Sequence, residues 1–162
     1  MSSLKIFIEY HFGRRKPNLK YYFNNEIIDP QNEMIAEEHK NQQNSILSFD
    51  VDLLKYNTLK IYMQDKTDND LVFLNDKQFI DHWCKIREIE VDGIKFETAL
   101  LNCCNFRHTM SKQWLEDMHS KGHEILPFYD RCNEMRLNGE FTINFFSPVW
   151  QFQIENYHER TY

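Results

Sequence analysis

The chain has 162 residues, of which 41% are hydrophobic, 15% are aromatic and 27% are charged. This composition is that of a globular protein rather than a disordered one, and the length allows a core that needs no disulfide or metal support. The formal charge of −6 argues against a protein that neutralises nucleic-acid phosphates, because such binding depends on clustered Lys and Arg. We therefore expect one domain over residues 1–162 and no nucleic-acid partner.

No apolar run reaches the roughly 18 residues that a membrane-spanning helix needs. The N-terminal sequence MSSLKIFIEYHF lacks the charged, apolar and small-residue segments of a signal peptide, so we expect synthesis in the cytoplasm without one. In that compartment the four cysteines, at positions 84, 103, 104 and 132, are expected to be reduced thiols.

Strand periodicity begins near the N-terminus. Residues 4–12, LKIFIEYHF, alternate between two faces, which predicts a strand, and the following GRRKPN has turn chemistry. Residues 19–29, LKYYFNNEIID, predict a second strand, in which Asn24 and Asn25 can take the positive φ of a tight turn.

The middle of the chain alternates between polar and strand-like segments. Residues 30–44 are polar, and we expect a surface loop there. Residues 45–54, SILSFDVDLL, and residues 56–64, YNTLKIYMQ, predict two half-buried strands. Residues 75–84 are less regular, and a single helical turn is expected there.

The second half begins with KIREIEVDGIKF at residues 85–96, where the Asp92-Gly93 pair predicts a tight turn between two strands. The best helix candidate is residues 111–126, with Ser111 as its N-cap and an apolar stripe that includes Trp114. Asn138-Gly139 is a hairpin-turn pair, and the strand that follows should end before Pro148.

Short strands separated by turns, with few helices, predict a mainly all-β fold. We expect a jelly-roll-like antiparallel β-sandwich with one or two short helices. In this arrangement residues 97–136 form a helix and loop elaboration, and residues 137–157 provide the closing strand.

The stretch DKTDNDLVF, which begins at Asp65, is the candidate metal site. Asp65, Asp68, Asn69 and Asp70, with Asp76 nearby, offer the side-chain oxygen ligands that calcium prefers. The spacing is not that of an EF-hand loop, because no Gly occupies the sixth position and no Glu the twelfth. The alternative is a set of solvated loop carboxylates.

Aromatic side chains are the candidate ligand-binding residues, because a pyranose presents C–H faces that stack on rings. Tyr62, Trp83 and Trp114 are the rings for which we predict this role, although most aromatic residues of the chain are expected to fill the core.

Catalytic signatures are weak. His119 and His123 are four residues apart, but no Glu follows the first His as a zinc-protease helix requires, and no GxSxG or phosphate loop is present. We expect a noncatalytic protein. An enzyme would require His108, His119, His123 and a cysteine to converge on one metal.

Three motifs resemble the small jelly-roll xylan-binding carbohydrate-binding modules. They are LKYYFNNEI, TLKIYMQD and KIREIEVDGIKF, and the likeness spans residues 4–96. The resemblance implies a calcium ion at the loops of one sandwich end, where it grips sugar hydroxyls, with Gln64 and Asp65 in place of the family's Asn-Asp pair. The family's Asp-Arg-Asn-Leu is replaced here by residues 84–87, CKIR, which puts the inherited calcium site in question.

The C-terminal FTINFFSPVWQFQIENY resembles small jelly-roll proteins of tailed phages, and abundant Asn, Lys, Ile, Phe and Tyr are typical of the AT-rich genomes of many viruses. Two functions follow as hypotheses. The first is a carbohydrate-binding module, calcium-assisted and phage-encoded. The second is a viral structural or assembly protein that contacts virion or host-surface proteins, which would place the chain in the virion.

Overall fold

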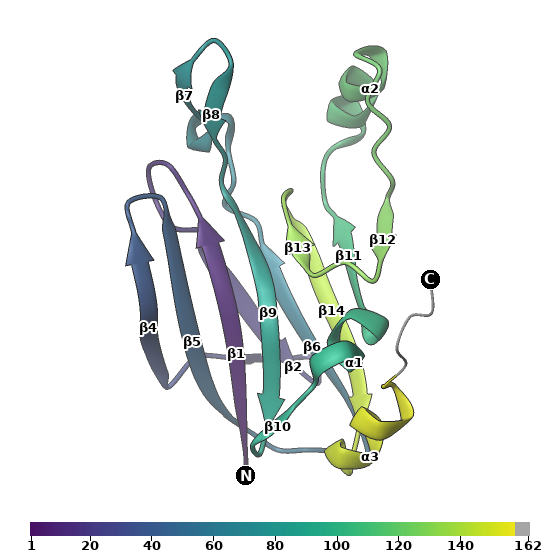
Figure 1. Ribbon diagram of the computed structural model, residues 1–162. Coiled ribbons are helices and arrows are strands. Elements are labelled where there is room, and N and C mark those ends of the chain that lie inside the picture. Colours follow the sequence, from purple (N-terminus) through teal and green to yellow (C-terminus); the bar gives the residue numbers. More distant parts are fainter. Residues whose placement is uncertain (158–162) are drawn as a thin grey trace.

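A computed structural model describes residues 1–157, and residues 158–162 of the predicted domain lie outside the described part. Two antiparallel six-stranded sheets pack as a sandwich (Figure 1). The predicted mainly-β antiparallel sandwich is therefore confirmed.

The first sheet has the strand order β10-β9-β1-β5-β4, and β13 also pairs with β9. Its strands are β1 (Ser2–His11), β4 (Asn32–His39), β5 (Gln42–Val51), β9 (Trp83–Val91), β10 (Ile94–Lys95) and β13 (Glu134–Met135). The second sheet has the order β12-β11-β14-β6-β2-β3. Its strands are β2 (Leu19–Phe23), β3 (Glu26–Ile28), β6 (Tyr56–Met63), β11 (Cys104–His108), β12 (Phe128–Asp130) and β14 (Gly139–Phe146).

The remaining elements lie at the two ends of the sandwich. At one end, the hairpin of β7 (Val72–Asn75) and β8 (Gln78–Ile80) projects beside helix α2 (Lys112–Ser120) (Figure 1). The short 3-10 helix η1 (Asp68–Asp70) precedes this hairpin. Helices α1 (Glu97–Cys103) and α3 (Val149–Glu155) lie at the opposite end (Figure 1). None of the helices described in residues 1–157 combines the length and the apolar character that a bilayer crossing requires.

The core lies between the two sheets and is built from alternate residues of their strands. Phe49 of β5 and Phe141 of β14 are at most 1% exposed, and Phe96, just before α1, is completely buried. Other buried members of the central strands are Leu4, Ile6 and Ile8 of β1, Leu59, Ile61 and Met63 of β6, and Ile143 and Phe145 of β14. The period-two pattern in the sequence therefore corresponds to inward-facing side chains.

The strongly alternating segments were predicted correctly. The hairpin turn at Asn24 and Asn25 has φ values of 50° and 70°, and Asp92 and Gly93 also have positive φ. The predicted α2 is present, and its first turn is capped by Ser111, whose Oγ accepts a hydrogen bond from the Trp114 backbone N–H at 3.2 Å.

The loop predicted at residues 30–44 is wrong, because β4 occupies most of it. Every residue of β4 is exposed, so the strand has no buried face and the sequence carries no alternation. It is held by backbone pairing to β5, with a register shift between Ile35 and Glu37. Such an irregularity is typical of edge strands, which must avoid pairing with other chains.

Several other local predictions were wrong. Residues 75–84 contain the end of the β7–β8 hairpin and the start of β9 instead of a helical turn. Residues 97–136 include β11, a strand of the second sheet, and β14 ends at Phe146, so that α3 occupies the C-terminal part of the predicted strand at 137–157.

The expected hairpin turn at Asn138 is also absent. Its side-chain amide instead pairs with the backbone of Lys66, accepting from the N–H at 3.0 Å and donating to the C=O at 2.9 Å. A long-range contact has replaced the local turn that the Asn-Gly pair favours.

Gly139 is needed where β14 meets β11, so Gly139→Ala should lower the free energy of unfolding by about 3 kcal/mol. An added Cβ would lie 2.3 Å from the carbonyl oxygen of Arg107 and 2.7 Å from the ring of Phe106. Urea denaturation measures the loss. Gly122→Ala is the control, since its φ is +83° but nothing lies within 4 Å of the new methyl group; it should cost only about 1 kcal/mol. Equal losses in the two variants would contradict this account.

Candidate functional site

The acidic loop after β6 is held by an arginine from a distant turn. The Arg15 guanidinium donates hydrogen bonds to the side chain and the backbone carbonyl of Asp65, and at 2.8 Å to the carboxylate of Asp70. The backbone N–H of Asn18 donates to the Asp65 carboxylate at 2.9 Å. We call the group of Arg15, Asp65 and Asp70 the Arg15 clasp.

Asp70 is the buried member of the clasp, with 3% of its surface exposed. Burial acts to raise the pKa of Asp70, but hydrogen bonds from Thr67 and Arg15 outweigh it, so that its pKa lies below the ordinary value. The Thr67 backbone N–H donates to the carboxylate at 2.8 Å. The buried ring of His82 lies nearby, with Nε2 3.4 Å from the Asp65 carboxylate.

The predicted calcium ligands differ in their surroundings. Arg15 already forms ion pairs with two of the three carboxylates predicted at residues 65–70, and Gln64 and Asp68 are exposed and do not take part in the clasp. Within residues 1–157, no group of three or more His, Cys, Asp and Glu side chains is placed to hold a metal ion. Calcium binding stays a prediction, and so does the noncatalytic character of the protein.

A pocket lies next to the clasp, at the end of the sandwich where the β7–β8 hairpin and α2 project. We call it the loop-end pocket, and its volume is about 510 Å³. Its apolar lining consists of Leu71, Phe73, Met110, Trp114, Met118 and Leu137, and its polar lining consists of Lys66, Thr67, Asp68, Asp81 and Asn138. The pocket thus brings together Asp68 and Trp114, two of the predicted site residues.

The polar side chains of the loop-end pocket differ in how they are held. The ammonium of Lys66 lies 2.7 Å from the Asp81 carboxylate and donates to the Arg136 carbonyl at 2.6 Å. Asp68 is exposed, and its carboxylate has no hydrogen-bond or ion-pair partner within residues 1–157. The pocket therefore has a fixed cation and a carboxylate that is free to accept hydrogen bonds from a ligand.

Helix α2 supplies Trp114, one of the two aromatic rings of the pocket; the other is Phe73 of β7. Its apolar stripe of Trp114, Leu115 and Met118 is half-buried, and no residue of the helix is fully buried. Trp114 and Met118 line the loop-end pocket, whereas Leu115 lines a separate hollow with His119 and His123. The ring of Trp114 therefore remains accessible to a ligand.

The other two predicted aromatic residues lie outside this pocket. Tyr62 donates its hydroxyl to Glu140, and burial together with that carboxylate raises the pKa of Tyr62 to about 12. Trp83 stacks on His11 with ring centroids 4.0 Å apart and planes 1° apart, and the Arg136 guanidinium lies 4.0 Å from the same ring. Two groups so close to one ring must cover opposite faces, so neither face of Trp83 is left for a sugar.

Sequence reasoning missed Arg15, Asp81 and Asn138. The run of Arg14, Arg15 and Lys16 beside Gly13 and Pro17 has the chemistry of an exposed turn, and only its basic charge could have suggested pairing with an acidic loop.

Comparisons with protein-family models, curated proteins and solved structures gave no match to this chain. The similarity to xylan-binding modules and to phage jelly-roll proteins therefore stays a prediction, and the function must be argued from the geometry of the pocket.

The clasp should contribute to stability. Arg15→Met leaves the buried Asp70 carboxylate without its cation, so we expect the free energy of unfolding to fall by about 1–3 kcal/mol at neutral pH. Arg14→Met is the matched control, because Arg14 is exposed and has no ion-pair partner within residues 1–157. Denaturation by urea distinguishes the two, and an equal effect of both variants would show that the clasp contributes nothing.

The clasp also predicts a pH dependence. Because the folded-state pKa of Asp70 is lowered, its contribution to stability is present above the ordinary carboxyl pKa of about 4 and is lost as the pH falls through the folded-state value. Thermal melts between about pH 5 and pH 3 should therefore fall more steeply for the natural chain than for Asp70→Asn. Parallel curves would contradict this assignment.

Proposed function

We propose that the protein is a noncatalytic carbohydrate-binding module whose ligand occupies the loop-end pocket. The observation that carries this proposal is that the pocket combines the Trp114 ring with the free carboxylate of Asp68. An aromatic ring accepts the C–H face of a pyranose, and a carboxylate accepts hydrogen bonds from adjacent hydroxyls.

The charges of the pocket favour neutral glycans. Lys66 is paired with Asp81, so the two charges cancel, and Asp68 leaves the pocket with an excess negative charge. A uronic or sialic acid would be repelled by that carboxylate. The side-chain amide of Asn138 is already bound to the Lys66 backbone, so its contribution is to fix the wall rather than to bind the sugar.

Calcium assistance is a separate part of the proposal. The carboxylates of the clasp would have to leave Arg15 to bind the ion, whereas the Trp114 and Asp68 contacts require no metal. Sugar binding at this pocket is therefore expected to persist in EDTA.

A second candidate function is protein assembly, as in a viral structural protein. It is favoured by the exposed apolar side chains of the β7–β8 hairpin, where Phe73, Leu74 and Phe79 are 57–69% exposed. Trp150 and Ile154 of α3 are similarly exposed at the other end of the sandwich. Exposed apolar surfaces of this kind are typical of protein contacts.

A glycan array followed by calorimetry tests the first function. Trp114→Ala and Asp68→Asn should each weaken binding of a neutral glycan at least about tenfold, by removing the stacking ring and the charged acceptor. Trp150→Ala is the control, because that tryptophan is 56% exposed but belongs to the opposite end. Repeating the titration in EDTA and in millimolar calcium tests metal assistance.

Two results would contradict sugar binding at the loop-end pocket. If no neutral glycan binds, or if Trp150→Ala weakens binding as much as Trp114→Ala, the loop-end pocket is not the sugar site. A concentration-dependent oligomer that is lost in Phe73→Ser and Phe79→Ser, measured by light scattering, would then support assembly.

A further inference from the structure

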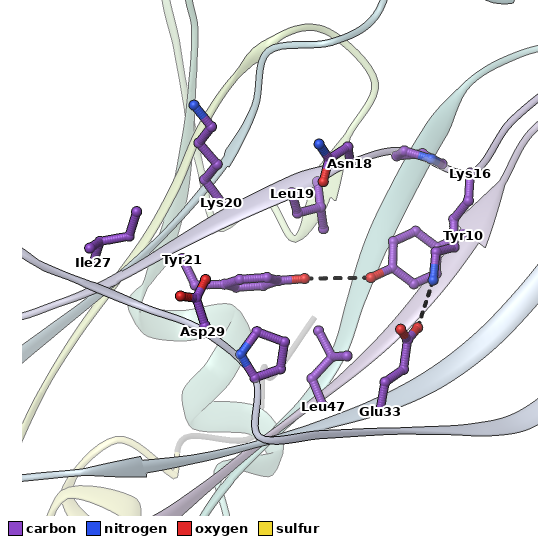
Figure 2. A pocket seen from close by; sticks show the side chains of 12 residues that line it. Tyr10, Lys16, Asn18, Leu19, Lys20, Tyr21, Ile27, Asp29, Glu33 and Leu47 are labelled. Carbon is purple, nitrogen blue, oxygen red and sulfur yellow. Dashed lines mark hydrogen bonds and ion pairs between the residues drawn. The ribbon is translucent and has the colours of Figure 1, made fainter.

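A second pocket lies on the flank of the sandwich, between the edges of the two sheets. We call it the flank pocket, and its volume is about 270 Å³. Figure 2 shows it between Tyr10 of β1, Leu47 of β5 and Glu33 of β4 on one sheet, and Leu19 and Tyr21 of β2 on the other. It shares no lining residue with the loop-end pocket.

Two buried tyrosine hydroxyls face each other in this pocket. Tyr10 and Tyr21 are 2% and 6% exposed, and their hydroxyl oxygens are 3.5 Å apart (Figure 2). Burial raises the pKa of both residues well above the ordinary value, so both remain protonated at neutral pH.

The hydroxyl pair leaves a donor unused. One O–H points to the other oxygen at a distance that is long for an O–H···O bond, and the second O–H has no acceptor within residues 1–157. A buried donor without a partner costs about 1–3 kcal/mol, so an acceptor brought by a ligand would be favoured here.

The walls of the flank pocket carry opposite charges. The segment at residues 16–20 contributes the ammonium group of Lys16, whereas Lys20 lies on the exposed face of β2 and its side chain points away from the two tyrosines (Figure 2). The segment at residues 29–33 contributes the carboxylates of Asp29 and Glu33. The two walls meet where Lys16 lies 2.6 Å from Glu33 (Figure 2), and the Lys16 ammonium also lies 4.9 Å from the centre of the Tyr10 ring.

We propose that the flank pocket binds a small zwitterion of the free α-amino-acid class. The ligand carboxylate accepts hydrogen bonds from the tyrosine O–H and from the remaining N–H groups of Lys16, while its ammonium faces Asp29 and Glu33. Charges of both signs on the walls favour a ligand that itself carries both signs, and the apolar Leu19 and Leu47 accommodate its side chain.

The size of the pocket supports this class of ligand. At about 270 Å³ the flank pocket is below the usual range for drug-sized ligands, and a single small molecule fills it. Partial desolvation of the Glu33 carboxylate acts to raise its pKa, but hydrogen bonds from Lys16 and Ser45 outweigh it, so the pKa is lowered and the wall keeps its negative charge.

The experiment uses the whole chain and the twenty free amino acids as probes, each at about 10 mM, in ligand-observed NMR followed by calorimetry. At least one amino acid should bind. Its N-acetyl and methyl-ester derivatives, which each lack one charge, should bind at least about tenfold more weakly.

Variants on β2 give a matched comparison. Tyr21→Phe removes only the buried hydroxyl and should weaken binding about tenfold, whereas Tyr22→Phe, on the opposite face of the same strand, should leave it unchanged. Lys16→Met should weaken binding in the same way as Tyr21→Phe. The melting temperature of each variant shows that it is folded.

Three results would overturn the proposal: no amino acid binds the folded natural chain, the singly charged derivatives bind as well as the free amino acid, or Tyr21→Phe and Tyr22→Phe bind alike. None of these results bears on sugar binding at the loop-end pocket, since Trp114 and Asp68 are absent from the flank pocket.

Discussion

The Arg15 clasp is the interaction on which the arrangement of both pockets depends. It joins the turn at residues 13–18 to the loop at residues 64–71, which are far apart in the sequence and belong to different connections of the sandwich. Lys16, the residue after Arg15, lines the flank pocket, and Asp68, two residues before Asp70, lines the loop-end pocket. A buried carboxylate paired with an arginine is costly to break, since the unpaired charge would remain desolvated. The same pair therefore fixes the position of a wall in each pocket.

Asparagine side chains perform the second structural task, which is to close the ends of strands. The chain has only four glycines, and its tight turn between β2 and β3 is made by Asn24 and Asn25, which tolerate positive φ. The buried amide of Asn57 accepts from the N–H and donates to the C=O of Leu54, both at 2.8 Å. Asn138 does the same with the backbone of Lys66. A side-chain amide has the donor and the acceptor of a peptide group, so it satisfies backbone groups where no strand continues.

The parts of this fold that the sequence predicts are those with one buried face. The segments that became β5 and β6 alternate strictly, because every second side chain enters the core. β1 alternates over residues 4–8, and β9 alternates on either side of a break at Arg87 and Glu88. β4 has no buried face and therefore no alternation, and α1 is a short helix that packs on β14, which is distant in sequence. β11 does alternate, but over only five residues, and its partner β14 is also distant in sequence. The candidate site was also predictable only in part. Asp68 and Trp114 could be named from their residue types, but their meeting in one pocket depends on the hairpin and on α2, whose positions no local signal gives.

Helix α2 carries the stacking ring of the proposed sugar site. It is amphipathic, yet none of its residues is fully buried, so the sandwich stabilises it through little apolar contact. Its accessible ring, Trp114, lines a pocket whose opposite wall belongs to the clasped loop and to Phe73 of the hairpin. A ligand that stacks on Trp114 and donates hydrogen bonds to Asp68 therefore contacts both α2, which has no fully buried residue, and the loop that Arg15 holds. In the proposed binding mode, the contacts that hold the ligand also hold α2 against the sandwich. The loop held by Arg15 supplies the fixed wall of this proposed site, and α2 supplies the ring on which the sugar stacks.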